Sequence, residues 1–399
     1  MNPHIRTLHQ LSSKRSRRIL GLMSGTSLDG LDMALCRISN SGFETVIETE
    51  QFITIPFTET FRNDIRGLSN NSSNTLEMTC RLHTYTGKLF ADMVNEALQK
   101  WNIAAADVDL IASHGQTVFH APLPDAARKE FGSGTLQIGD GDRIAKETGI
   151  ITISDFRQKH IAAGGQGAPL APYGDFLLFS EMKSDVLMLN IGGIANFTWL
   201  PAGRDAAKVI CSDTGPGNTL MDMQMQRDFR GKMYDEGGQA AAQGKVLQRL
   251  LDMLLDHPFF QLPLPKTTGT ELFNRKYLED AMQRTGMKEF PRTDIMATLN
   301  YFTALTIAAA VKSVTKENQA LKFYISGGGV HNKVLTERIR QLLQDRNISY
   351  HSTLEKNIQP DAKEAILFAL LANECVAGDP SVFGKDHSFL PATSMGKIS

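Results

Sequence analysis

The sequence has few cysteines and lacks long apolar runs. Its 399 residues include four cysteines, and no two of them form a C-x-x-C pair. This spacing excludes a disulfide framework or a zinc ribbon and suits a reducing compartment. No apolar run approaches the roughly 18 residues that a membrane-spanning helix needs. We therefore expect a cytoplasmic protein without a membrane partner.

An excess of charge of one sign is also missing. The 42 Lys and Arg side chains nearly balance the 43 Asp and Glu side chains, which gives a formal net charge of −1. This balance argues against nucleic acid or an anionic membrane as a partner, so local donors must bind any anionic ligand. The basic stretch Lys14–Arg18 is not followed by the apolar core of a signal peptide. We predict that residues 1–18 form a disordered basic leader.

Three common nucleotide-binding signatures are absent. The chain has no G-x-x-x-x-G-K-[ST] sequence, which excludes a P-loop. Its nearest approach to G-x-G-x-x-G is Gly215-Pro-Gly217, which lacks the third glycine. The lysine, H-R-D and D-F-G set of protein kinases is missing as well.

What the sequence does contain is an alternation of β-rich apolar runs and segments with helical spacing. This alternation predicts an α/β protein whose sheets are covered by helices. A strand, a glycine turn and a returning strand occur at Ile19–Ile38 and again at Val186–Leu200. The chain is long enough for two domains, so we predict two structurally related halves.

Three glycine-rich turns follow β-like runs, at Gly21–Gly30, Leu189–Asn196 and Tyr324–Asn332. Glycine permits positive φ angles and lets the backbone approach a ligand closely. Successive amide groups in such turns form concavities that bind anions such as phosphates. One such turn is as often a plain hairpin, but three of them favour nucleotide binding.

The order of these turns resembles the phosphate-1, phosphate-2 and adenosine motifs of the actin-like ATPase superfamily. A longer ordered set, from about Arg18 to about Gly378, resembles the anhydro-N-acetylmuramic acid kinase family. Its members are Met23–Gly30, Ser113–Thr117, Leu136–Asp140, Asp155–Arg157, Gly164–Leu170, Asn190–Asn196, Asp213–Asn218, Lys266–Gly269 and Gly327–Asn332. Each motif is weak alone, whereas the ordered set is specific.

The resemblance implies a two-domain actin-like (ribonuclease H-like) ATPase fold, with mixed sheets flanked by helices and with ATP and substrate in the interdomain cleft. We expect residues 19–155, with about 376–399, to form the N-terminal domain and residues 156–375 the C-terminal nucleotide-binding domain. A homodimer is also implied. The apolar segments Leu299–Val314 and Phe259–Leu264 are candidates for its interface, although buried core is the ordinary role of such stripes.

The implied reaction uses ATP and Mg²⁺ as cofactors. ATP phosphorylates O6 of 1,6-anhydro-N-acetylmuramic acid while water opens the anhydro ring at C1, which gives N-acetylmuramic acid 6-phosphate and ADP. One alternative is another actin-like hexose or N-acetylhexosamine kinase that involves no hydrolysis. Another is a catalytically silent nucleotide-binding regulatory module, against which the intact Asp213 and phosphate turns argue. A glycosidase would not need three nucleotide-type turns.

The resemblance places the family's catalytic aspartate at Asp213, as the base that deprotonates water. Without it, an Asx-turn before Thr-Gly-Pro-Gly is the more ordinary explanation of that aspartate. The residues expected to bind the ATP phosphates are Gly25, Thr26, Ser27, Leu28, Asp29, Gly30, Leu31, Asp32, Gly192 and Gly193. Asp29 and Asp32 are also the candidate metal ligands, through water. Met23 stands where the wider superfamily usually has an aspartate, which leaves the metal ligands open.

Adenosine is expected at Gly327, Gly328, Gly329 and Asn332. The expected sugar-binding residues are His114, Gln116, Thr117, Asp140, Asp155, Gln166 and Glu364. A lone histidine after a strand is usually a turn residue, and a glutamate that opens a helix usually serves only the helix dipole. The resemblance is what makes both of them site candidates.

Overall fold

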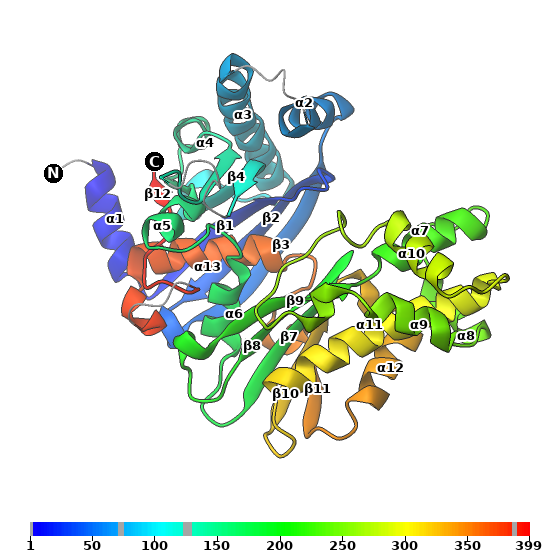
Figure 1. The fold of residues 1–399 in the computed structure, drawn as a ribbon. Helices are drawn as coiled ribbons and strands as arrows, with labels where there is room; N and C mark the ends of the chain where they lie inside the picture. Colours follow the sequence, from blue (N-terminus) through cyan, green and yellow to red (C-terminus); the bar gives the residue numbers. More distant parts are fainter. Residues whose placement is uncertain (1–2, 71–75, 123–129, 385–388) are drawn as a thin grey trace. The chain divides into compact units, whose positions relative to one another are not determined.

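A computed structural model describes residues 3–70, 76–122, 130–384 and 389–399. The chain forms two compact units, both drawn in Figure 1. Unit 1 comprises Met1–Leu178 and Thr353–Ser399, and unit 2 comprises Phe179–Ser352. Both boundaries differ from the expected ones at 155 and 375. The physical reason is packing, because the last long helix, α13 (Lys363–Ala377), lies on the sheet of unit 1.

The sheet of unit 1 has the strand order β12-β6-β4-β1-β2-β3. Its strands are β1 (Ser16–Ser24), β2 (Gly30–Ser39), β3 (Val46–Pro56), β4 (Leu110–Ala121), β5 (Gly134–Ile138), β6 (Thr152–Ser154) and β12 (Lys397–Ile398). The first three strands are antiparallel neighbours, whereas β4 runs parallel to β1 and β6 runs parallel to β4. β5 forms a hairpin with β4, and β12 pairs with β6 at the edge.

Helices cover both faces of this sheet, as Figure 1 shows for unit 1. They are α1 (Pro3–Ser13), α2 (Glu59–Asn70), α3 (Leu76–Lys100), α4 (Gly141–Thr148), α5 (Phe156–Ala162), α6 (Ala171–Phe179) and α13. On one face Leu20 and Leu22 of β1 share a core with Phe90 of α3. Gly21 lies between these two leucines in the strand and therefore points to the other face, where α13 lies.

The expected disordered leader is instead folded onto unit 1. Residues Pro3–Ser13 form α1, which contacts α13, and Leu11 is buried. Arg17 is 2% exposed, and its guanidinium donates to Asn373 Oδ1 at 2.7 Å and to the Leu11 carbonyl at 3.0 Å. Lys14 forms an ion pair with Asp109. The basic residues therefore have acceptors within the fold, which composition alone could not reveal.

Unit 2 holds a sheet of strand order β11-β10-β7-β8-β9. Its strands are β7 (Asp185–Ile191), β8 (Ile194–Leu200), β9 (Ile210–Pro216), β10 (Leu321–Ser326) and β11 (Ile348–His351). Its helices are α7 (Thr219–Asp228), α8 (Gln239–Gln243), α9 (Gln248–Leu255), α10 (Arg275–Arg284), α11 (Arg292–Val314) and α12 (Lys333–Leu342). β7 to β9 are antiparallel neighbours, and β10 and β11 follow in parallel on the other side of β7.

The long helix α11 forms the centre of the unit 2 core. It is long and apolar enough to cross a membrane, but 78% of its most apolar window is buried, as is usual for a core helix of a folded domain. Leu299 and Phe302 belong to the core cluster, and Phe259 is buried as well. The apolar stripe expected as a possible dimer face is therefore core, and Leu262 is the large apolar side chain of the second segment that is exposed.

The two sheets share one topology. In each, three antiparallel strands lie in sequence order, and two further strands are added in parallel beside the first. The orders β3-β2-β1-β4-β6 and β9-β8-β7-β10-β11 correspond strand for strand. The prediction of two related halves is confirmed, and the relation lies in topology rather than in a repeated sequence.

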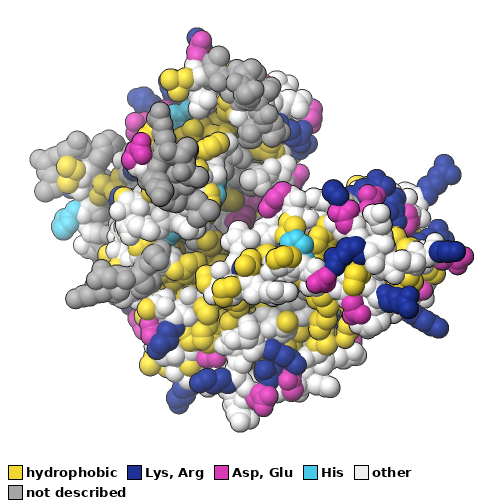
Figure 2. Space-filling view, in the orientation of Figure 1, with side chains coloured by type: hydrophobic (Ala, Val, Ile, Leu, Met, Phe, Trp, Pro, Cys, Tyr) yellow, Lys and Arg dark blue, Asp and Glu magenta, His cyan; other side chains and the backbone are white. Residues whose placement is uncertain are grey.

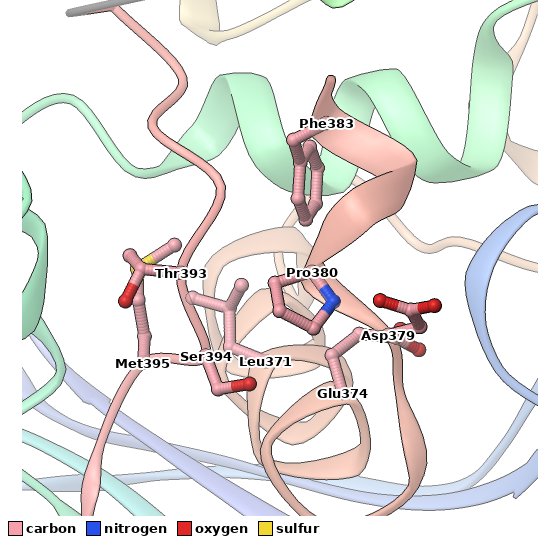
Figure 3. A pocket seen from close by; sticks show the side chains of 8 residues that line it. All are labelled: Leu371, Glu374, Asp379, Pro380, Phe383, Thr393, Ser394 and Met395. Carbon is pink, nitrogen blue, oxygen red and sulfur yellow. The ribbon is translucent and has the colours of Figure 1, made fainter. Parts of the chain in front are cut away.

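A small cavity in unit 1 lies at the C-terminal end of α13 (Figure 3). Its volume is about 10 Å³, and its lining includes Leu371, Glu374, Pro380, Phe383 and Met395. That volume has room for about one water molecule. The cavity is therefore too small for a sugar or a nucleotide.

Candidate active site

The first glycine turn joins β1 to β2 in unit 1. Leu28 adopts a positive φ of 61° and buries its side chain in the core, whereas Thr26 and Ser27 are exposed. The Leu28 amide donates to the Gly25 carbonyl at 3.3 Å, which closes the turn. The buried leucine thus anchors the turn and leaves two hydroxyl groups in solvent, where a phosphate can reach them.

Other residues predicted for this turn serve the fold. A Cβ on Gly30 would lie 2.5 Å from the Ile55 carbonyl oxygen, so glycine is required there by the neighbouring strand β3. Leu31 is fully buried in the core of unit 1. Sheet packing therefore explains why glycine stands at position 30 and leucine at position 31.

Gln116 ties the turn to β4. β1 and β4 run in parallel and bring Gln116 beside Ser24, whose hydroxyl donates to Gln116 Oε1. Gln116 Nε2 donates to the carbonyls of Gly25, at 3.4 Å, and Thr117, at 3.2 Å. Gln116, which we predict to bind the sugar, is buried and holds the first glycine turn in place.

Two carboxyl groups near this turn interact electrostatically. The Asp32 carboxylate accepts a hydrogen bond from Thr54 Oγ1 at 2.5 Å. Burial raises the pKa of Asp32, and the charges of Asp361 and Asp29 raise it further. Burial likewise raises the pKa of Glu364, in the first turn of α13, with Asp32 as the next cause. The side chains of Asp32 and Glu364 therefore share one region of unit 1.

His114 and Arg157 meet in the same region. Arg157 Nε donates to His114 Nε2 at 3.0 Å, and the His114 ring lies 4.7 Å from the ring of Phe368 on α13. Nε2 must therefore carry a lone pair, which places the proton of neutral His114 on Nδ1. Burial and the charge of Arg157 lower the pKa of His114 to about 3, so the ring stays neutral at physiological pH.

This buried neutral histidine predicts a loss of stability in acid. His114 has a pKa of about 3 in the folded state against 6.5 as the reference, so its stabilising contribution is present above pH 6.5 and falls as pH drops towards 3. When the pH falls from 8 to 5, the free energy of unfolding should therefore decrease by about 2 kcal/mol less in His114→Asn than in the original protein. Urea unfolding followed by Trp101 emission in a Trp199→Phe background measures unit 1. Parallel pH dependences in the two proteins would contradict this assignment.

In the part of the chain that the structure describes, the remaining predicted sugar-binding residues make their contacts outside this cluster or are exposed. Asp140 caps α4 by accepting from the Asp142 amide at 3.0 Å. Asp155 forms an ion pair with Lys397 of β12. Thr117 accepts from Gln137 Nε2 at 3.1 Å, and Gln166 is exposed.

In unit 2, Asp213 lies in β9 beside the 266–268 segment. Its Oδ2 atom accepts from the Thr268 amide at 2.8 Å, and its own amide donates to the Lys266 carbonyl at 3.0 Å. Burial raises the pKa of Asp213, and the charge of Glu271 adds to the effect. The Asx-turn alternative is not what the structure shows, because the carboxylate binds an amide 55 residues away in sequence.

The second glycine turn joins β7 to β8 and contacts the start of α7. The carbonyl of Gly193 accepts from the Gly217 amide at 2.8 Å, and that of Gly192 accepts from the Asn218 amide at 2.8 Å. A Cβ on Gly217 would lie 2.2 Å from the Gly192 oxygen, so glycine is essential to this contact. The carbonyls face α7, which leaves the amides of the turn as its donors for a ligand.

The third glycine turn follows β10 and contacts the end of β7. Gly327 has a φ of 82°, and a Cβ there would lie 2.6 Å from Asn190 Oδ1. A Cβ on Gly329 would lie 2.3 Å from Ile191 Cγ2. Asn332 is buried and caps α12 by accepting from the Leu335 amide at 3.0 Å. The second and third turns therefore lie side by side in unit 2, and Asn332 contributes a helix cap.

Sequence reasoning did not single out Arg157 or Asn218. Asn218 Nδ2 donates to the Ile191 carbonyl at 3.3 Å, next to the two glycine turns of unit 2. Both residues end motifs that the resemblance includes, Asp155–Arg157 and Asp213–Asn218. The motifs thus included Arg157 and Asn218, but only the structure shows that these two residues contact other residues of the candidate site.

On the face of unit 2 drawn in Figure 2, Lys and Arg side chains are interspersed with Asp and Glu. This agrees with the balanced composition of the sequence. Two units of one topology, each with a glycine turn after its first strand, define the actin-like (ribonuclease H-like) class of ATPases and sugar kinases.

Comparison with known proteins narrows the class. The sequence model described as "Anhydro-N-acetylmuramic acid kinase" matches residues 17–398. An anhydro-N-acetylmuramic acid kinase of Pseudoalteromonas atlantica is 49% identical over 399 residues, which are 100% of this chain and 99% of the relative. One from Caldanaerobacter subterraneus subsp. tengcongensis is 38% identical over 403 residues, which cover 98% of this chain and 99% of the relative. The chain belongs to the anhydro-N-acetylmuramic acid kinase family, and the resemblance inferred from its motifs is confirmed.

Solved structures align less closely. The activator of the 2-hydroxyisocaproyl-CoA dehydratase from Clostridium difficile with bound ADPNP covers 90% of this chain and 95% of its own, with a TM-score of 0.42 and 10% identity. The alignment with a putative N-acetylmannosamine kinase from Listeria monocytogenes covers 89% of this chain and 98% of that one, with a TM-score of 0.35 and 13% identity. The fold assignment therefore rests on strand topology.

Proposed function

We propose that the protein is an ATP-dependent kinase that opens the ring of 1,6-anhydro-N-acetylmuramic acid with water and phosphorylates O6. The products are N-acetylmuramic acid 6-phosphate and ADP, as in the recycling of cell-wall sugars. The observation that carries this proposal is family membership over residues 17–398, with the glycine turns and Asp213 all present. A phosphotransferase with a sugar alcohol as acceptor is the reaction class of that family.

Asp213 serves as the general base. Its Oδ2 atom is engaged by the Thr268 amide, which fixes the carboxylate, and Oδ1 is the atom proposed to take the proton from water. The water oxygen bonds to C1 as the bond between C1 and O6 breaks. O6 then bonds to the γ-phosphorus, and ADP leaves with the electron pair of the broken phosphorus–oxygen bond.

The turns bind ATP in this proposal. Thr26 and Ser27 offer exposed hydroxyl groups in unit 1, and the amides of Gly192 and Gly193 have no acceptor among the residues that the structure describes. Close packing at Gly327 and Gly329 shapes the adenosine turn. The residues suit phosphates because backbone amides and hydroxyls bind anions without a net positive charge.

Asp29 and Asp32 fit a magnesium ion that also binds phosphate oxygens. Mg²⁺ sites in kinases use one or two carboxylates with phosphate oxygens and water, and these two carboxylates lie close enough for Asp29 to raise the pKa of Asp32. The described residues contain no cluster of three or more metal-binding side chains. The ion would neutralise charge on the transferred phosphoryl group.

We also propose that the protein is a cytoplasmic homodimer, as the family resemblance implies. Light scattering of the purified protein gives the mass directly. A mass near 88 kDa, twice the 44.0 kDa of the chain, is the expected result, and 44.0 kDa would contradict the dimer.

The function is tested with 1,6-anhydro-N-acetylmuramic acid and Mg·ATP in ¹⁸O-labelled water, followed by mass spectrometry. One ¹⁸O at C1 of a sugar 6-phosphate is the expected product, because the attacking water supplies that oxygen. ADP formed with another sugar, without label, would favour a kinase that does not hydrolyse its substrate. ATP binding without turnover of any sugar would favour a silent nucleotide-binding module.

A further inference from the structure

Arg157 is a largely buried guanidinium with no carboxylate partner. It donates from Nε to His114 Nε2 at 3.0 Å and from Nη1 to the Gly167 carbonyl at 3.2 Å. Both acceptors are uncharged. No ion pair links Arg157 to a carboxylate in the part of the chain that the structure describes. A charge in such a place is normally paired, because burial without a counterion is costly.

The described groups around Arg157 form no direct ion pair with its charge. Its positive charge lowers the pKa values of His114, His120 and His160, after burial as the first cause. These rings are therefore kept neutral and add no charge. Glu364 is the acidic group that attracts Arg157 electrostatically, although the pair lies beyond ion-pair distance. The groups that accept hydrogen bonds from Arg157 are thus neutral, and Glu364 acts on its charge from beyond ion-pair distance.

The surrounding elements hold Arg157 in a fixed orientation. His160 Nδ1 accepts from the Gly167 amide at 2.8 Å, and the Gly167 carbonyl then accepts from Arg157. Phe368 packs on His114, which fixes the other acceptor. The bonds from Nε and Nη1 leave Nη2 with no recorded partner among the described residues. One side of the planar fork is therefore left for an anion.

This cation belongs to the region of the phosphate turn. His114 lies two residues before Gln116, whose amide reaches the Gly25 carbonyl. The charges of Asp32 and Arg157 both act on the pKa of Glu364, in the first turn of α13. These links place Arg157 and the first glycine turn in one region of unit 1.

We propose that Arg157 binds the carboxylate of the substrate's lactyl ether group and so selects muramic-type over glucosamine-type anhydro sugars. This inference rests on the proposed function, since the lactyl carboxylate is the anionic group of that substrate. Carboxylates form their strongest neutral-pH contacts with arginine through paired N–H donors. His114 and Gly167 act as positioning residues for this contact.

The test compares two sugars by calorimetry, 1,6-anhydro-N-acetylmuramic acid and 1,6-anhydro-N-acetylglucosamine, which lacks the lactyl group. Arg157→Met should weaken binding of the first sugar about 100-fold and of the second less than about threefold, as expected for loss of a charge-assisted contact. Arg157→Lys keeps the charge but loses the fork, so an intermediate loss of about tenfold is expected. Arg340→Met, which removes an arginine stacked on Tyr350 in unit 2, is the control and should change neither affinity.

Equal losses for the two sugars in both Arg157 variants would overturn the proposal and leave Arg157 a structural role. If Arg157→Met fails to fold, Arg157→Lys still tests the proposal. A loss of affinity for the anhydromuramic sugar that exceeds the loss for the anhydroglucosamine sugar supports it, and equal losses overturn it. Failure of the proposed function has a different signature, because the original protein would then bind neither anhydro sugar.

Discussion

Asp213→Asn is expected to lower kcat at least about 10³-fold with little change in ATP affinity. Removing a general base typically costs 10²–10⁴ in rate, and Asp213 is proposed to start both ring opening and phosphoryl transfer. Asn retains an oxygen that can accept from the Thr268 amide, so β9 should keep its contact with the 266–268 segment. Coupled ADP release measures turnover, and calorimetry measures ATP binding.

The acid limb of the rate profile gives a second test of Asp213. Burial raises its pKa above that of an ordinary carboxyl group, and the base must be ionised to act. Activity should therefore rise with pH through a value above 3.8. Asp252→Asn, on the exposed side of α9, is the matched control and should keep full activity. Turnover retained in Asp213→Asn would assign the base to another residue.

Much of the fold could be predicted from the sequence, because strands and glycine turns leave local signals. The runs at Ile19–Ile38 and Val186–Leu200 are hairpins in the structure, as predicted. The domain boundaries were harder to predict. α13 lies on β1 although the whole of unit 2 separates them in sequence, and no local pattern encodes such a contact.

The sequence shows the motifs of the candidate site but not the individual contacts of their residues. Asp140 and Asn332, which we predict to bind ligands, both cap helices in the structure, a role that the same residue types fill for local reasons. Arg157 shows the opposite case. Its proposed role rests on the lack of an ion pair to a carboxylate among the described residues, and burial and pairing depend on residues far away in sequence.

Glycines illustrate the same limit. Within one motif, Gly25 lies in the turn, whereas Gly30 makes room for β3 and Gly21 makes room for α13. The sequence does not distinguish a glycine that admits a ligand from one that admits a neighbouring backbone. Only the position of a hypothetical Cβ separates the two kinds.

Gly21→Ala should be the most destabilising of the substitutions considered. The added Cβ would lie 1.9 Å from the Ala365 carbonyl oxygen and 3.1 Å from the Ala369 amide nitrogen. Both are backbone atoms of α13, so no side chain can rotate away and the helix must move off the sheet. Overpacking of cores typically costs 1–3 kcal/mol, and a rigid contact this short places the cost at about 3 kcal/mol or more.

The prediction is checked by thermal unfolding of unit 1, with Trp101 as the reporter in a Trp199→Phe background. These are the two tryptophans of the chain, one in each unit. A fall in Tm of roughly 6–12 °C is expected for a unit of this size. Gly67→Ala is the control, because nothing lies within 4 Å of its Cβ in helix α2 and alanine there should stabilise by about 1 kcal/mol.

A displaced α13 also has a consequence for function. Ala365 follows Glu364 directly, and Phe368 packs on His114, so movement of the helix should disturb the surroundings of Arg157. Gly21→Ala should therefore weaken binding of the anhydro sugar at temperatures where unit 1 is still folded. An unchanged Tm and sugar affinity would mean that α13 does not lie as close to β1 as its contact with Gly21 requires.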